Sequence, residues 1–196
     1  MNCLVVSAHP LEDSLCAHLS AAACDTLAHA GHTIVMENLY QNRFEPALTA
    51  TERTTYYNGP YDSRAVKEET ERLLAADSLI LVFPTWWFGF PAILKGWFDR
   101  VWAPGLAYDH APDLGPIRPR LGHLKHVLAV TTLGAPWWVD CLVMQQQVRK
   151  TLKIALLKTC APQCRFKMLS LYKSEACPAK KIDRFTRQIS GILEKW

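Results

Sequence analysis

Residues with side chains suited to binding a ligand gather in three short stretches of the chain. The first, SAHPLEDSL, covers residues 7–15 and contains His9 and Ser14. The second, PTWWFGFP, covers residues 84–91 and has three aromatic residues in a row. The third, TTLGAPWW, covers residues 131–138 and joins two threonines and a glycine to two tryptophans. Hydroxyl and imidazole groups can bind phosphate, and large aromatic rings can enclose a flat ligand.

Each of these stretches follows or includes the end of a short apolar run that predicts a buried β-strand. The runs are CLVVSA at 3–8, LILVF at 79–83 and HVLAVTT at 126–132, and helical patterns separate them. Strands that alternate with helices form a parallel sheet, and ligands bind such a sheet beyond the carboxyl ends of its strands. We therefore expect the three stretches to converge on one crevice.

The remaining elements complete an α/β protein. Two further strands are expected at 33–37 and 165–172, which makes five parallel strands with helices on both faces. Helices are expected between Ser14 and Gly31 and then at 63–76, 91–102, 139–158 and 178–195. Pro91 is expected in the first turn of its helix, a position that proline favours. The irregular stretch 39–62 is long enough to indicate a functional loop. The whole chain, residues 1–196, is predicted to form one domain.

Composition and charge disfavour several other classes of protein. The 22 lysines and arginines are scattered and the net charge is +4, so nucleic-acid binding is not expected. Seven cysteines, an odd number, show no paired spacing, and no partner completes a metal site with Cys160 and Cys164. Neither a signal-peptide pattern nor a membrane-spanning run is present. We expect a cytoplasmic protein, not embedded in a membrane, with free thiols and no metal.

The first stretch stands at a strand-to-helix turn, where free N–H groups attract phosphate. It contains neither GxGxxG nor GxxxxGK[ST], so a Rossmann dinucleotide site or a P-loop is disfavoured. Glu12 and Asp13 must point outward if phosphate binds there. An ordinary capped helix beside a hydrogen-bonded loop histidine is the alternative interpretation.

The aromatic stretches also have interpretations that involve no ligand. Trp86, Trp87 and Phe88 suggest a flat partner such as a flavin ring, but they could form a hydrophobic latch or a dimer contact. The latch or dimer contact is the better interpretation for the tryptophans of the following helix, Trp97 and Trp102.

In the third stretch, Thr131, Thr132 and Gly134 predict a tight polar turn that lets backbone approach a ligand. Trp137 and Trp138 could wall a substrate pocket, although either one alone is more typical of a core.

Residues 3–138 resemble the NAD(P)H:quinone oxidoreductase family, the DT-diaphorase-like branch of the flavodoxin-like proteins. The most specific part is AADSLILVFPTWWFGFPAILKGWFDRVW at 75–102. The turn at 8–14, GLAYDH at 105–110 and VTTLG at 130–134 follow in the family's order. The last sixty residues match only as helix, strand and helix. The resemblance implies a flavodoxin-like three-layer sandwich with a five-stranded parallel sheet.

This resemblance also implies a cofactor and a reaction. NAD(P)H, either NADPH or NADH, would reduce a bound flavin and leave, and a quinone-like small molecule would then be reduced in the same slot. The flavin would be FAD, which the long 39–62 stretch favours slightly, or alternatively FMN. The residues expected to bind it are His9, Ser14, Leu15, Cys16, Pro84, Thr85, Trp86, Trp87, Phe88, Thr131, Thr132, Leu133 and Gly134.

Members of the family are typically homodimers whose active site lies at the subunit interface. Tyr108 and His110 fall where aromatic residues border the substrate pocket, and His110 is a possible proton donor, with a lone surface histidine as the alternative. The 91–102 helix and the 39–62 stretch would be natural dimer surfaces.

The sequence departs from the family at several positions. Cys16 stands where asparagine is common and Leu15 where phenylalanine is. APWWVDCLV replaces the stretch that carries the proton-handling Tyr and His of the mammalian enzymes. A one-electron shuttle, a flavin-bound regulatory subunit of an ion-efflux system and a nitro- or azo-compound reductase therefore remain alternatives.

Overall fold

A central sheet of five parallel strands organises the chain. The computed structural model describes residues 1–111 and 115–196. The strands are β1 (Asn2–Ser7), β2 (Thr33–Asn38), β3 (Ser78–Pro84), β6 (His126–Leu133) and β7 (Arg165–Tyr172), in the order β2-β1-β3-β6-β7. All four strand pairs are parallel. The order reverses between β1 and β3, so the carboxyl ends of these two strands flank the switch point.

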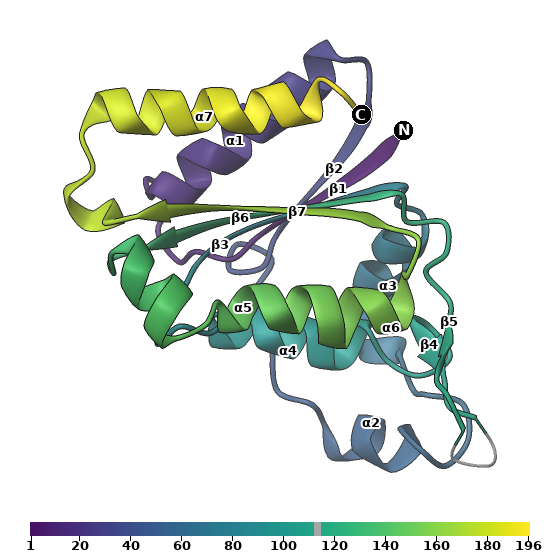
Figure 1. The fold of residues 1–196 in the computed structure, drawn as a ribbon. Helices are drawn as coiled ribbons and strands as arrows, with labels where there is room; N and C mark the ends of the chain where they lie inside the picture. Colours follow the sequence, from purple (N-terminus) through teal and green to yellow (C-terminus); the bar gives the residue numbers. More distant parts are fainter. Residues whose placement is uncertain (112–114) are drawn as a thin grey trace.

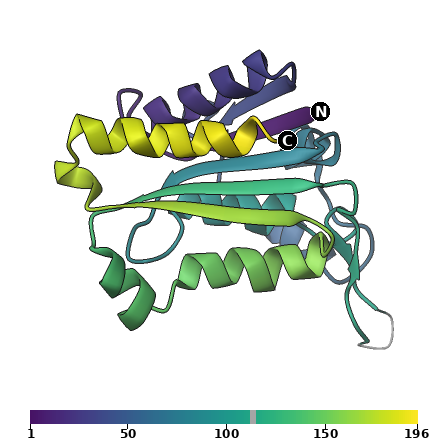
Figure 2. The same ribbon diagram turned by 45° about the horizontal axis from the view of Figure 1, so that its top comes forward.

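Helices cover both faces of the sheet and make a three-layer sandwich (Figures 1 and 2). Helices α1 (Leu15–His29) and α7 (Ala179–Leu193) pack side by side on one face, where Thr26 and Ser190 share a hydrogen bond of 2.8 Å. The other face carries α3 (Lys67–Leu74), α4 (Ala92–Val101) and the helical run from α5 (Gln147–Lys150) to α6 (Lys158–Cys160). The flavodoxin-like α/β fold expected from the sequence is confirmed.

Successive side chains of a strand point to opposite faces of the sheet, and this explains why the protein has two hydrophobic cores. Leu4 and Val6 of β1 face the α4 side, whereas Cys3 and Val5 face α1 and α7. Every residue of β3 is buried, as expected for a central parallel strand. A small ribbon formed by β4 (Tyr108–Asp109) and β5 (Arg118–Pro119) and the short helix α2 (Ala50–Thr55) lie outside the sheet.

The boundaries of the strands agree with the sequence to within two residues, but three helices differ. Pro91 is the N-cap of α4 and lies before its first turn. The expected helix at 63–76 begins with a 3-10 turn at Arg64–Val66. The expected helix at 139–158 is broken, because Gln145 and Gln146 have left-handed φ angles of 53° and 52°. Wide π-type turns at Val139–Val143 and Thr151–Leu157 flank this break.

The aromatic stripe of α4 belongs to the core, so its interpretation as a latch or dimer contact is wrong. Trp97 and Trp102 are 0% and 3% exposed. The Trp97 Nε1–H donates to Oε1 of Glu37 over 2.6 Å, and Arg72 donates to the other oxygen over 3.2 Å. Burial raises the pKa of Glu37 despite these two donors.

Residues 39–62 are tied to α4 by one buried guanidinium. Arg100 donates from Nη2 to Oε1 of Glu52 over 2.7 Å, and both side chains are almost fully buried. Arg100 also donates to the Glu45 carbonyl, and the Tyr61 hydroxyl donates to the Arg100 carbonyl over 3.0 Å. Burial alone would raise the pKa of Glu52, but the hydrogen bonds from Arg100 and Thr49 lower it.

Gly96 shows how closely this segment approaches α4. A Cβ atom on Gly96 would lie 2.5 Å from both Cα and Cβ of Pro46, which is closer than atoms can pack. We expect Gly96→Ala to lower the free energy of unfolding by about 1–3 kcal/mol, the usual cost of overpacking. Chemical denaturation would measure the change. Gly191→Ala on α7, where a Cβ meets nothing within 4 Å, is the matched control and should not destabilise the protein. Equal stability of the two variants would contradict the close approach.

Candidate functional site

A crevice opens at the carboxyl ends of β1, β3 and β6. Its volume is about 260 Å³, and the three stretches expected to converge all contribute to it. Its walls are formed by His9, Leu15, Pro84, Thr85, Trp86, Thr132, Gly134, Ser174 and Glu175. Seven of these nine residues belong to the predicted site.

The first loop presents backbone N–H groups to this crevice. Ser14 is the N-cap of α1, and its Oγ accepts from the Ala17 N–H over 3.2 Å, as in an ordinary capped helix. The N–H groups of Leu15 and Cys16 lie in the first helical turn and have no intrahelical acceptor. Glu12 and Asp13 are exposed and do not line the crevice, and Glu12 accepts instead from Gln41.

His9 holds a defined tautomer at the same turn. Its Nδ1 accepts from the Leu11 N–H over 3.1 Å, so in the neutral ring Nε2 carries the proton. This Nε2–H is available to donate to an anion, and the ring lies 6.3 Å from that of Trp86. The loop therefore offers two backbone donors and one imidazole donor at a helix N-terminus, which suits a phosphate.

The second loop is a tight turn with strained backbone. Trp86 and Gly89 exchange hydrogen bonds of 3.2 and 2.9 Å, and the two residues between them, Trp87 and Phe88, have φ angles of 50° and 56°. Such type I′ turns favour Asn and Gly, because other residues pay about 1–3 kcal/mol for a left-handed conformation. The turn leaves the Trp87 side chain 99% exposed. Because this strained backbone conformation exposes the Trp87 indole to solvent, we infer that the indole contacts a bound ligand.

In the third loop, alternate residues face the crevice and the protein interior. Thr131 is buried and shares a 2.6 Å hydrogen bond with Thr85, and Leu133 is buried as well. Thr132 and Gly134 face the crevice. The Cys16 thiol lies 3.7 Å from the Thr132 hydroxyl beneath the crevice, and burial raises the pKa of Cys16 to about 11. The side chains of Thr131, Leu133 and Cys16 are therefore not available to a ligand in the crevice.

Besides Tyr108 and His110, four predicted aromatic residues do not line the crevice. Trp87 and Phe88 belong to the turn at its rim but do not line it. Trp137 and Trp138 are 58% and 50% exposed on the following helical segment, and neither lines the crevice.

Tyr108 is the first residue of β4 and His110 directly follows this strand. Figure 1 shows β4 and β5 beside the end of the sheet away from the strand arrowheads. The Tyr108 hydroxyl donates to that of Tyr56 over 3.4 Å, and the His110 ring lies 4.8 Å from the Tyr57 ring. Burial raises the pKa values of Tyr108 and Tyr56. Neither residue lines the crevice of its own chain.

Sequence reasoning missed two residues of the crevice, Ser174 and Glu175. They follow β7, whose carboxyl end lies on the same edge of the sheet as the other strand ends. A Cβ on Gly134 would lie 2.9 Å from Oε1 of Glu175, so this carboxylate extends across the glycine. The signal was available, because a strand was expected at 165–172 and the loop after it had to reach the same edge.

The described residues supply no other evident centre. Across residues 1–111 and 115–196, no group of three or more His, Cys, Asp or Glu side chains could hold a metal ion. All seven cysteines, which lie within these ranges, are free. No helix in the described part of the chain is long and apolar enough to cross a membrane.

Comparison with known proteins identifies the class to which this fold and crevice belong. The family model Flavodoxin_2, which describes proteins with a flavodoxin-like fold, matches residues 1–185, so the chain belongs to this family. Within the family it is 39% identical over 113 residues to YcaK of Escherichia coli K12, an uncharacterised NAD(P)H oxidoreductase. It is 33% identical over 150 residues to NAD(P)H dehydrogenase [quinone] 1 of Cavia porcellus. These alignments cover 56% and 67% of this chain, and the chain spans 57% and 53% of the two relatives.

Solved structures share the fold over its full length. Smu.1420 from Streptococcus mutans UA159 superposes with a TM-score of 0.85 at 26% identity, covering all of both chains. An FMN-dependent NADH-azoreductase from Bacillus anthracis, solved with FMN, superposes with a TM-score of 0.77 at 16% identity and covers 100% of this chain and 99% of its own. At that identity the azoreductase supports the fold alone.

Proposed function

We propose that the crevice binds a flavin and that the chain is an NAD(P)H-dependent oxidoreductase that reduces quinones or similar acceptors by two electrons. The strained turn at Trp86–Gly89 is the observation that carries this proposal, because it presents an indole to solvent beside a helix N-terminus. The relatives named as NAD(P)H oxidoreductases and quinone dehydrogenases support it.

The described residues fit the parts of a flavin. The N–H groups of Leu15 and Cys16 and the Nε2–H of His9 would hold the phosphate. Trp86 in the crevice and Trp87 at its rim would lie against the ring system, and the ring edge would approach Thr132, beside the Glu175 carboxylate that extends across Gly134. A flavin held there would supply two-electron redox chemistry between the nicotinamide and the acceptor. The protein orients the ring and keeps one face open, and it needs no nucleophile.

The choice between FAD and FMN belongs to this proposal. The expectation of FAD came from the 39–62 segment, and none of its residues lines the crevice. The azoreductase that shares the fold holds FMN. FMN is therefore the first flavin to test, with FAD as the alternative.

Absorbance spectroscopy of the purified chain tests the assignment. Incubation with FMN or FAD should give protein-bound bands near ~375 and ~450 nm, anaerobic NADPH or NADH should bleach them, and a quinone should restore them. Steady-state rates with quinones, azo dyes and nitroaromatics would rank the acceptors. A chain that stays colourless with both flavins would overturn the proposal.

A homodimer would account for the position of Tyr108 and His110. Since both lie far from the crevice of their own chain, we propose that they border the crevice of a second copy. His110→Ala should raise the KM for a quinone by about three- to tenfold and leave the Kd of the flavin unchanged, since the exposed His110 ring packs on the rings of Tyr57 and Tyr108 and does not line the crevice. Equilibrium sedimentation should show a dimer. A fully active monomer would contradict this arrangement.

Two further expectations from the sequence, the cytoplasmic location and the single domain 1–196, stay predictions.

A further inference from the structure

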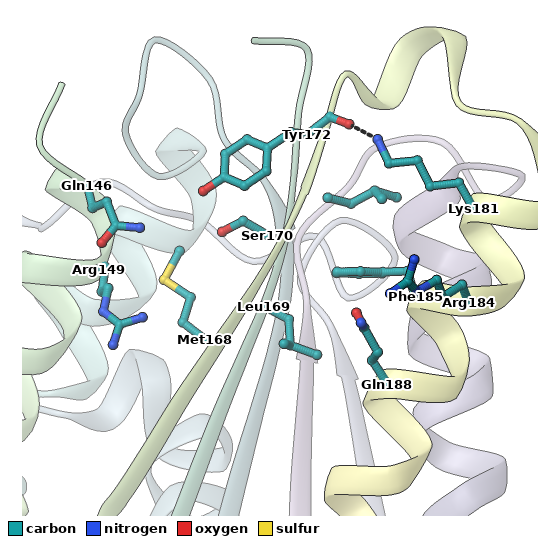
Figure 3. A pocket seen from close by; sticks show the side chains of 11 residues that line it. Gln146, Arg149, Met168, Leu169, Ser170, Tyr172, Lys181, Arg184, Phe185 and Gln188 are labelled. Atoms are coloured by element: carbon teal, nitrogen blue, oxygen red, sulfur yellow. Dashed lines mark hydrogen bonds between the residues drawn. The ribbon is translucent and has the colours of Figure 1, made fainter. Parts of the chain in front are cut away.

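The outer edge of β7 lies at the bottom of a groove between two helices (Figure 3). β7 is the last strand of the sheet, so one of its sides has no neighbouring strand. Gln146 and Arg149 stand on one wall and Lys181, Arg184 and Gln188 on the other, with a volume of about 410 Å³ between them. This groove is separate from the flavin crevice and shares no lining residue with it.

The open edge offers unpaired backbone groups. The Arg165 N–H donates to the Lys125 carbonyl over 2.9 Å, so odd-numbered residues of β7 face β6. Alternation then turns the N–H and C=O groups of Phe166, Met168 and Ser170 outward. The outward carbonyl of Tyr172 accepts from Lys181 Nζ over 2.5 Å, which agrees with this register. An edge of this kind is a template for another strand.

Charge indicates what kind of strand would bind. The lining includes three cations, Arg149, Lys181 and Arg184, and no Asp or Glu. Among the described residues, none of the three has a carboxylate within 4.0 Å. Because alternate side chains of an extended peptide point to opposite walls, acidic residues could meet cations on both.

We propose that β7 binds an extended peptide carrying acidic side chains, which adds as a sixth strand of the sheet. Backbone hydrogen bonds to Met168 and Ser170 fix the strand, while the two basic walls select acidic side chains. A second copy of this chain is a poorer occupant, because edge-to-edge pairing would bring Arg149 and Arg184 against like charges.

The first test uses a defined probe, the fluorescent peptide acetyl-Glu-Glu-Val-Val-Glu-Glu-Val-Val-amide, and fluorescence anisotropy at low salt. It should bind the whole chain, whereas the analogue with lysine in place of glutamate should not. A glutamate peptide N-methylated through its central half keeps its charge but cannot pair as a strand, so it should bind at least about tenfold more weakly.

Protein variants test separately how the basic walls of the groove and the backbone edge of β7 contribute to peptide binding. Arg149→Glu with Arg184→Glu should weaken binding at least about tenfold. The matched control, Lys158→Glu with Lys195→Glu, changes net charge equally at exposed residues outside the groove and should change affinity less than about twofold. Ser170→Pro removes one outward N–H, a change that edge strands tolerate, and should also weaken binding. Circular dichroism would confirm that each variant is folded.

Hydrogen exchange identifies the contact itself. Bound peptide should slow exchange at the Met168 and Ser170 amides. The proposal is overturned if the N-methylated peptide binds as tightly as its parent, since simple attraction of anions would then suffice. It is also overturned if no acidic peptide binds, or if Ser170→Pro abolishes self-association of the chain and the edge is therefore occupied by a second copy.

Discussion

Replacing Arg100 by methionine is expected to lower the free energy of unfolding by about 3–5 kcal/mol, because the Glu52 carboxylate would stay buried without its partner. The variant would also leave the Glu45 carbonyl without its donor. Urea denaturation should show a lower midpoint with an unchanged slope, which indicates lost stability and not a changed unfolded state.

Two further variants test whether burial is the cause. Arg64→Met removes the partner of Asp62 from an ion pair in which the arginine is 87% exposed, and water screens such a pair, so stability should hardly change. The double variant Arg100→Met with Glu52→Met replaces both buried charges, so it should be more stable than Arg100→Met alone. A loss below about 1 kcal/mol for Arg100→Met would contradict the buried pair.

Acidification should act on the same interaction. The pKa of Glu52 lies below its ordinary value of 4.5, so the ionised carboxylate stabilises the folded state above that value. This stability is lost as the pH falls through the lowered pKa. Arg100→Met should reduce this part of the acid dependence, because the guanidinium and Thr49 together lower the pKa.

Exchanging Trp87-Phe88 for Asn-Gly is expected to change stability and flavin binding in opposite directions. Asn and Gly accept the two left-handed conformations, so the free energy of unfolding should rise by about 1–2 kcal/mol. The flavin would lose an aromatic surface worth about 2–3 kcal/mol, so its Kd should rise about thirty- to 150-fold. Thermal denaturation and fluorescence titration with FMN would measure the two effects.

Arg43→Gly is the matched control for this exchange. Arg43 is exposed, has a φ angle of 51° and does not line the crevice, so glycine should relieve strain without changing the flavin Kd. Unchanged flavin binding in the Asn-Gly variant would show that the turn does not serve the ligand.

The strands could be predicted from sequence because buried parallel strands are short apolar runs. LILVF at 79–83 lies within the fully buried β3, and 165–172 matches the bounds of β7. The broken helix could not be predicted, since Gln145 and Gln146 carry no signal for a left-handed conformation. The pairing of Arg100 with Glu52 was also hidden, because the two residues lie 48 positions apart and only tertiary packing brings them together.

The sequence could predict that the carboxyl ends of the strands share one edge of the sheet. From that expectation, seven residues of the crevice were predicted correctly. Which side chains face inward depends on register, so Thr131, Leu133 and Cys16 were expected with Thr132 although their side chains are buried. Tyr108 and His110 were placed from family resemblance alone. That resemblance implies a site at a subunit interface, and neither residue lines the crevice of its own chain.

The single guanidinium that anchors residues 45–61 also gives the chain a region able to open by itself. Its contacts with Arg100 and Gly96 involve α4, and Tyr56 and Tyr57 contact Tyr108 and His110 at the small β4–β5 ribbon, so none of these contacts involves the five-stranded sheet. Local opening can therefore release this segment while the five strands stay paired. Amide exchange across α2 should report a free energy of opening well below that of β3, and a protease should cleave this segment before any other buried part of the chain.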